Sequence, residues 1–314
     1  MTGTPTPKKG FVPLPTSARP ASAADDLSYC AREVRRYDND RFLTCLFAPA
    51  DRREALFALL AFNLEIAKTR EVVTEPLIGH MRLQWWRDAI DGLYQPPDRR
   101  PPVSGHEVVR PLAEAIARHG LSREPFDRLI DAREADLDDA SPASLAELVA
   151  YAEATGAPLV ALGLQVLGLA TWDREAAEAA AEAGRSVGIA WALTGLLRAV
   201  PFHVRQRRVT LPADLLARHG LSAARLIDWR PDPQALAPVV AEVAVVARTH
   251  LAAARRLAGK SPRAALPVLL PATLAELYLD GVARTGHDVF APRHQARHPL
   301  RPLWLAWRAW RRRY

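Results

Sequence analysis

Cysteine is scarce in this sequence, which has only Cys30 and Cys45 among its 314 residues. Two cysteines cannot form a structural zinc site by themselves and do not indicate a disulfide scaffold. Long apolar runs are also missing: the best candidates, 157–169 and 187–200, are shorter than the roughly 18 to 20 residues that a spanning helix needs. We therefore expect a protein of a reducing compartment, without redox chemistry and without a membrane-spanning helix.

Several catalytic signatures are absent as well. The nine histidines show no H-E-x-x-H pairing, there is no G-x-S-x-G nucleophile elbow, and no glycine-rich phosphate loop occurs. Neither a zinc finger nor an aromatic RNA-binding motif is visible, so we expect no nucleic-acid partner.

What the chain does have is apolar content and basic charge. Hydrophobic residues make up 49% of the chain, which is enough for one large buried core. The 42 Lys and Arg residues exceed the 35 Asp and Glu residues, leaving a net charge of +7. This excess favours anionic partners such as diphosphates or anionic lipid, without choosing among them.

The ends of the ordered part follow from composition. Residues 1–24 are rich in Pro, Thr, Ser and Ala and contain no acid, which predicts a flexible tail. A transit peptide is the alternative, but the prolines oppose the amphipathic helix that such peptides form. No low-complexity linker divides the remainder, so we predict a single domain over 25–314.

From Asp25 onward the pattern is that of an all-helical protein. Leu27, Cys30, Val34 and Tyr37 share one helical face, and a helix beginning after Thr74 has Ile78, Met81, Trp85 and Ala89 on one side. Predicted N-caps are Asp51, Ser104 and Ser144, each followed three residues later by Glu, while Gly120, Gly156 and Gly168 are predicted helix ends. Long helices are expected at about 235–257 and 266–285, and strand-like alternation is nearly absent.

Three strings resemble the squalene and phytoene synthase family: Leu60–Asn63 through Glu71, Gly188–Arg198 and Val209–Pro212. The resemblance covers nearly the whole ordered chain. It implies the all-α isoprenoid synthase fold, with helices around a central apolar cleft. Enzymes of this family join two isoprenyl diphosphates head to head, using magnesium held by aspartates on two facing helices.

This sequence departs from the family at those aspartates. The first acidic motif reads Ala67-Lys68-Thr69-Arg70-Glu71, and only Glu71 is acidic. Ala199 and His203 occupy the positions of the second motif. Magnesium requires oxygen ligands, so these substitutions predict no catalytic residue, no metal site and no cofactor. Magnesium would be needed only if the chain were a prenyltransferase after all.

Basic residues near the same positions suggest a different ligand chemistry. The candidate anion or diphosphate cleft consists of Lys68, Arg70, Glu71, Arg198, His203 and Arg208. Guanidinium groups can bind phosphate or carboxylate oxygens without metal. Solvated surface charge is the alternative. A second acidic cluster, formed by Asp131, Glu134 and Asp138, is either a displaced metal site or a solvated helix face.

A narrower resemblance links the chain to the branch of this family that assists assembly of mitochondrial respiratory complex I, NADH:ubiquinone oxidoreductase. The strings that show it are Phe62–Ala67, Ile78–Trp86, Ala199–His203 and Pro302–Tyr314. That branch likewise lacks the aspartate motifs. The resemblance implies complex I subunits or assembly intermediates as partners.

The C-terminus predicts a basic amphipathic helix. Leu303, Trp307, Trp310 and Tyr314 share one side, while Arg301, Arg308 and Arg312 group on another. Such a helix suits an anionic bilayer surface or a groove on a partner, with packing against the bundle as the alternative. The predicted membrane or partner helix comprises Trp304, Trp307, Arg308, Trp310, Arg311 and Arg312.

Three functions compete at this point. The first is a non-catalytic assembly or scaffold factor for complex I, located in the cytoplasm at the inner face of the membrane, or in the mitochondrial matrix of a eukaryote, and binding an isoprenoid or anionic lipid. The second is a prenyltransferase that condenses isoprenyl diphosphates. The third is a carrier that holds a lipid in the apolar cleft without chemistry.

Overall fold

The protein is seen here in a computed structural model, which describes residues 27–73, 75–96, 98–99, 105–228, 232–291, 299–311 and 313–314. These residues form helices and turns, with no strand among them. The predicted tail over 1–24 lies outside them, as does Arg312.

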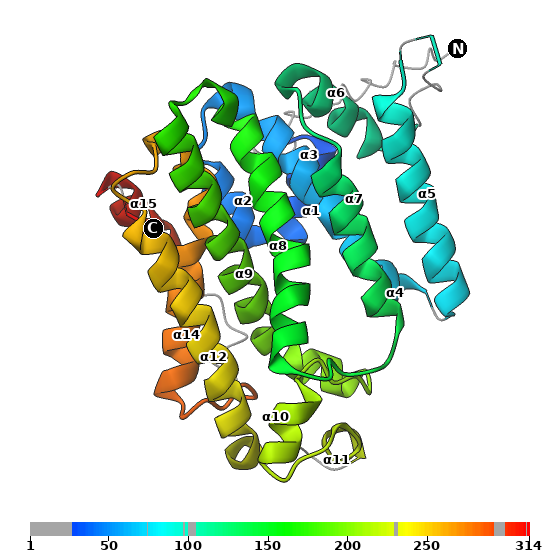
Figure 1. The fold of residues 1–314 in the computed structure, drawn as a ribbon, viewed down its shortest axis with the longest axis vertical. Helices are drawn as coiled ribbons and strands as arrows, with labels where there is room; N and C mark the ends of the chain where they lie inside the picture. The colour runs from blue at the N-terminus through cyan, green and yellow to red at the C-terminus, as the bar shows by residue number, and fades with distance from the viewer. Residues whose placement is uncertain are drawn as a thin grey trace, which may run out of the picture.

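The helices follow one another along the chain as labelled in Figure 1. They are α1 (Tyr29–Tyr37), α2 (Asn39–Cys45), α3 (Ala50–Ala67), α4 (Thr69–Val72), α5 (Pro76–Tyr94), α6 (Val109–His119), α7 (Glu124–Ala132), α8 (Leu145–Val166), α9 (Arg174–Arg205), α10 (Ala213–Arg218), α11 (Ala223–Asp228), α12 (Pro233–Arg256), α13 (Leu266–Leu269), α14 (Pro271–Arg284) and α15 (Arg301–Trp310).

The helices α8 and α9 form the centre of the bundle, and their backbones touch. A Cβ atom placed on Gly188 would lie 2.7 Å from the backbone nitrogen of Ala157, and one on Gly156 would lie 2.3 Å from the carbonyl oxygen of Gly188. The prediction that Gly156 ends a helix was therefore wrong. Gly156 lies inside α8. A residue without a side chain is needed there, because any Cβ atom would prevent the close approach of α9.

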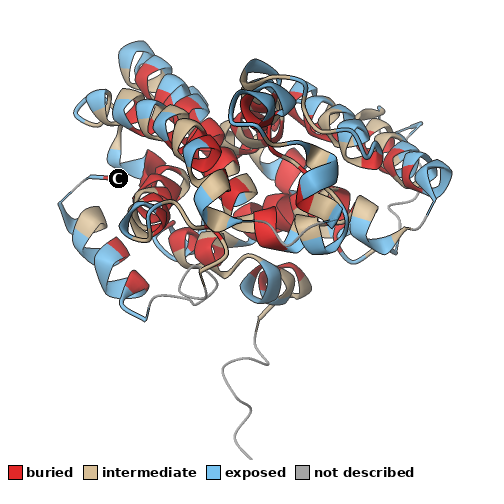
Figure 2. Ribbon diagram, turned by 90° about the horizontal axis from the view of Figure 1, so that it is seen from below, coloured by how far each residue is buried: buried red, intermediate tan, exposed pale blue. Residues whose placement is uncertain are grey.

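Two buried apolar clusters form the core, and α8 contributes residues to both. One joins α9, α12 and α14, and the other joins α1, α3, α5, α6 and α7. Figure 2 shows the buried residues along the inner faces of the helices and the exposed residues around the rim. The all-α fold predicted from the sequence is confirmed.

Local capping signals had mixed outcomes. Ser144 caps α8, since its hydroxyl accepts a hydrogen bond from the Glu147 amide at 3.2 Å. Gly120 ends α6 with φ of 60°. Asp51 lies inside α3 rather than at its N-cap. The predicted cap Ser104 lies outside the described residues.

Four stretches are long and apolar enough to cross a membrane by length and composition alone: α8, α9, α12 and residues 263–284. The expectation that no segment meets this criterion was wrong. Alanine is itself apolar, so long alanine-rich helices with few charges meet the criterion although their runs of large apolar residues are short. In the fold, α8 and α12 both pack against α9.

A buried ion pair fixes α15 to the bundle. Arg301 pairs with Asp40 of α2, and both side chains are buried. The Tyr278 hydroxyl of α14 donates to the same carboxylate at 2.6 Å. Arg301, which the sequence groups with Arg308 and Arg312 on one side of this helix, is therefore part of the interior. Tyr314 is buried too, where its hydroxyl donates to the Ala254 carbonyl at 3.0 Å, so it does not continue the exposed aromatic stripe.

Candidate functional site

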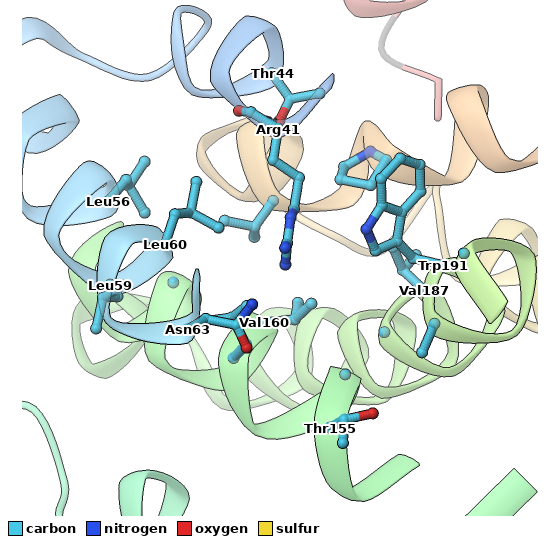
Figure 3. Close-up of a pocket in the computed structure, with 18 of the residues that line it drawn as sticks. Arg41, Thr44, Leu56, Leu59, Leu60, Asn63, Thr155, Val160, Val187 and Trp191 are labelled. Carbon is cyan, nitrogen blue, oxygen red and sulfur yellow. Dashed lines mark hydrogen bonds between the residues drawn. The ribbon is translucent and has the colours of Figure 1, made fainter. Parts of the chain in front are cut away.

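A central pocket of about 250 Å³ lies among the helices of the bundle. Its walls are mostly apolar and come from α2, α3, α8, α9, α13 and the start of α14. Figure 3 shows Leu56, Leu59 and Leu60 on one side of the space and Val187 and Trp191 on the other. We call this space the central pocket. Its lining matches the predicted apolar cleft.

Several polar side chains interrupt the apolar walls, among them Arg41 and Asn63. Arg41 reaches from α2 into the central pocket, toward Asn63 of α3 (Figure 3). The Arg41 Nε atom is paired with the Asp38 carboxylate at the start of α2. Asn63 is 5% exposed, and its Oδ1 atom has no hydrogen-bond partner.

A second, polar pocket of about 440 Å³ adjoins the first and shares Arg133, Tyr151 and Leu196 with it. The Tyr151 hydroxyl donates to Asp136 Oδ1 at 2.6 Å and accepts from Arg133 Nη1 at 2.9 Å. Burial raises the pKa of the Tyr151 phenol, so it stays protonated at neutral pH. We call this second space the polar pocket.

The structure brings four of the six predicted cleft residues together. Arg70, Glu71, His203 and Arg208 line the polar pocket. The other two, Lys68 and Arg198, lie outside this pocket and interact with other residues. Lys68 pairs with buried Glu65, which also accepts from Arg82 at 2.6 Å. The Arg198 guanidinium lies 3.6 Å from the centre of the Tyr278 ring, close to Asp40.

The charge balance of the polar pocket is acidic rather than basic. Its three guanidinium groups belong to Arg70, Arg133 and Arg208. Its five carboxylates belong to Glu71, Asp136, Asp138, Asp139 and Glu147. Burial, followed by the nearby Arg208 charge, lowers the pKa of His203, which keeps that side chain neutral at pH 7. This balance does not favour an anionic ligand, and the predicted anion cleft stays a prediction.

The most informative residues of the central pocket carried weak sequence signals. Asn63 stands inside a string that identifies the family, but its polarity alone does not distinguish a wall residue from a surface residue. Arg41 is one of many arginines in amphipathic helices. Only the fold shows that these two side chains line the same pocket.

Comparison with known proteins settles the family. Residues 34–308 match the family model described as squalene/phytoene synthase. The chain belongs to this family.

Within the squalene/phytoene synthase family, this chain is similar to two kinds of protein. It is 36% identical over 291 residues to the rat protein named NADH dehydrogenase (ubiquinone) complex I, assembly factor 6, with 92% of this chain and 84% of that one covered. It is 27% identical over 210 residues to chloroplastic phytoene synthase 1 of Arabidopsis thaliana, covering 64% of this chain and 48% of that one.

Solved structures support the fold. The squalene synthase HpnC from Alicyclobacillus acidocaldarius superposes with a TM-score of 0.68 at 20% identity, over 82% of this chain and 93% of that one. The isoprenoid synthase fold predicted from the family resemblance is thereby confirmed.

The residues at the family's two metal positions do not fit magnesium. Ala67, Glu71 and His203 line the polar pocket and Ala199 lines the central pocket, so these positions do face the two pockets. However, no group of three or more His, Cys, Asp or Glu side chains among the described residues could hold a metal ion. Magnesium prefers several oxygen ligands, and these positions offer a single carboxylate.

The alternative metal cluster was wrong for a specific reason. Arg87 donates to Asp131 at 2.8 Å and to Glu134 at 2.7 Å, so one guanidinium already occupies an oxygen of each carboxylate. Asp138 lies beyond the end of the helix that was expected to align the three acids.

The two cysteines offer no reactive thiolate, because burial raises the pKa of each to about 12.

Proposed function

We propose that this protein is a non-catalytic assembly or scaffold factor for respiratory complex I. The observation that carries the proposal is its similarity, over nine-tenths of its length, to a relative named as a complex I assembly factor. The missing metal ligands also support a non-catalytic role, since a departing diphosphate would have no metal to neutralise it. The partners are complex I subunits or assembly intermediates.

Deletion of the gene tests this role. We expect assembled complex I, measured on native gels and as NADH:quinone activity of isolated membranes, to fall several-fold in the deletion strain. The wild-type gene should restore it, and succinate dehydrogenase activity serves as the control for general membrane damage. Normal complex I in the deletion strain would contradict the proposal.

Prenyl transfer is the second candidate function, and the family match favours it. It requires magnesium, for which the described residues provide no ligand group. The carrier hypothesis is compatible with the central pocket, which is large and apolar enough for part of an isoprenoid chain. An isoprenoid therefore suits the central pocket better than an anionic lipid does.

A peripheral membrane contact through α15 is the second part of the proposal. Leu303, Trp304, Trp307 and Trp310 form an exposed apolar side of this helix, which we call the tryptophan face. Leu303 and Trp310 are 68% and 77% exposed. Tryptophan side chains suit the boundary between headgroups and acyl chains.

A basic groove next to the tryptophan face supplies charge for anionic headgroups. It is lined by Arg255, Lys260, Arg263, Arg308, Arg311 and Arg313, with Asp173 as its one acidic residue. Three of these cations, Arg263, Arg311 and Arg313, have no carboxylate partner within 4.0 Å among the described residues. The groove is the part of the surface that suits an anionic lipid.

The proposed location follows from these surfaces. The tryptophan face would lie against the inner face of the membrane, on the cytoplasmic side or, in a eukaryote, on the matrix side. A peripheral position there would bring the protein close to complex I intermediates at the same membrane.

A further inference from the structure

One side of α5 presents four large apolar side chains to solvent. We call this side the exposed stripe of α5, and it consists of Leu77, Ile78, Met81 and Trp85. The helix already buries a different side, with Leu83, Trp86 and Ile90, inside the molecule. Figure 1 shows α5 at the outer edge of the bundle. A surface helix needs only one apolar side to pack on its own core, so the second side indicates a missing partner.

Trp85 is held in position on this stripe by neighbouring rings. Its ring meets the ring of buried Trp86 edge-on, with 4.9 Å between the centroids, and lies 5.2 Å from the ring of His106. These contacts restrict the side chain before any partner arrives, which lowers the entropy cost of binding. Tryptophan is also among the residues that dominate the binding energy of protein interfaces.

The unpaired charges next to the stripe are acidic. Glu75 directly precedes the first turn of α5, and Asp88 follows Trp85 by about one turn, so a carboxylate lies near each end of the stripe. Among the described residues, no cation lies within 4.0 Å of either carboxylate. The two arginines of α5, Arg82 and Arg87, are both paired with carboxylates of other elements. The ends of the stripe therefore favour a basic partner.

This charge distribution favours a protein segment over a membrane. An anionic leaflet would repel the two carboxylates, whereas cationic side chains would pair with them. Because Glu75 and Asp88 are 13 positions apart, they lie about 20 Å apart along the helix axis. A second copy of this chain does not supply cations at that spacing through α15, because Arg301 at the start of α15 is buried.

We propose that the exposed stripe of α5 binds an amphipathic helix of a protein partner, whose apolar side covers the stripe and whose basic ends pair with Glu75 and Asp88. Such a helix has apolar residues three and four positions apart, and cations near both ends of that apolar run. The chemistry of the binding helix follows from α5 alone. Only the identity of the partner, a complex I subunit or assembly intermediate, rests on the proposed function.

Fluorescence anisotropy with two labelled peptides tests this pairing on the purified full chain. Both peptides are helices of about 18 residues with the same leucine stripe, and they differ in having either lysine or glutamate at both ends. The basic peptide should bind at least about tenfold more tightly than the acidic one. The net charge of +7 favours the acidic peptide, so a general charge effect would act in the opposite direction. Equal binding of both peptides, or of neither by the folded protein, would overturn the proposal.

Charge reversal assigns the contact to its residues. Glu75→Lys together with Asp88→Lys should reverse the preference, so that the acidic peptide binds more tightly than the basic one. The Glu75 side chain makes no capping hydrogen bond, so this variant should fold, which urea unfolding verifies. Glu178→Lys together with Glu182→Lys changes the net charge equally at exposed positions of α9 and should keep the wild-type preference. Reversal in the α9 variant, or none in the α5 variant, would contradict the assignment.

The apolar contact has its own variant. Leu77→Ser together with Met81→Ser should weaken binding of the basic peptide at least about tenfold. Sedimentation velocity of the wild type distinguishes a second copy as the occupant. A dimer that dissociates in this serine variant would show that the stripe binds another copy of the chain, and it would overturn the proposal.

Complementation of the deletion strain separates this inference from the complex I role. At equal protein levels, the wild-type gene and the α9 charge variant should restore complex I, whereas the α5 charge variant should restore less than about half. Full restoration by the α5 charge variant would overturn docking through α5 and leave the assembly role standing. Normal complex I in the deletion strain would overturn the assembly role, while the peptide preference would still decide whether the stripe binds a basic helix.

Discussion

Replacing Gly188 by alanine is expected to lower the free energy of unfolding by about 1–3 kcal/mol. The new methyl group would lie 2.7 Å from the Ala157 nitrogen and 2.7 Å from the Gly156 carbonyl carbon. These are backbone atoms of α8, so no side-chain rotation can relieve the overlap, and α8 and α9 must separate. The higher helix propensity of alanine, worth about 1 kcal/mol, offsets only part of this cost.

Gly195→Ala is the control for this substitution. Gly195 also lies in α9, but no atom lies within 4 Å of the place where its Cβ would be. Alanine there should stabilise the protein by up to about 1 kcal/mol. Urea unfolding of both variants provides the comparison. Equal stability of the two would show that the backbone contact between α8 and α9 has no energetic importance.

Serine at Trp304, Trp307 and Trp310 together should reduce binding to anionic vesicles by at least about tenfold. These side chains are among the exposed residues of α15, and their loss removes apolar area that would otherwise enter the headgroup region. Binding of the wild type should also weaken at high salt, because the basic groove contributes through charge. Co-sedimentation with vesicles containing phosphatidylserine measures both effects.

The exposed stripe of α5 supplies a matched control. Leu77, Ile78 and Met81 are 68%, 49% and 65% exposed. This helix lies on the opposite side of the molecule from α15 in Figure 1. Serine at these three positions should leave vesicle binding unchanged. A larger loss of vesicle binding for the α5 variant than for the α15 variant would place the membrane contact on α5 and contradict the proposal.

The positions of the helices were predicted from the sequence more reliably than the contacts between helices. The Ser144 cap and the left-handed Gly120 are local features, decided by a few adjacent residues, and both were predicted correctly. Gly156 has the same residue type as Gly120 but a different role, since it allows a contact with a helix 32 residues further along the chain, at Gly188. Periodicity contains no information about such a contact.

Charged residues show the same limit at the candidate site. The expected cleft grouped Lys68 and Arg198 with Arg70 because all are basic and near the family's motifs. In the fold, Glu65 pairs with Lys68, while Asp40 and the Tyr278 ring accommodate Arg198. Arg301, grouped with Arg308 and Arg312 from helical spacing, has its partner 261 residues away in Asp40. Pairing across such distances depends on tertiary structure alone.

The central claim is that this member of the family does not catalyse prenyl transfer. An assay of prenyl transfer tests that claim most directly. The purified protein would be incubated with farnesyl or geranylgeranyl diphosphate and magnesium, beside an active squalene synthase, while diphosphate release and lipid products are followed. We predict no turnover by the folded protein when the control is active. Magnesium-dependent formation of a head-to-head isoprenoid product would contradict the account.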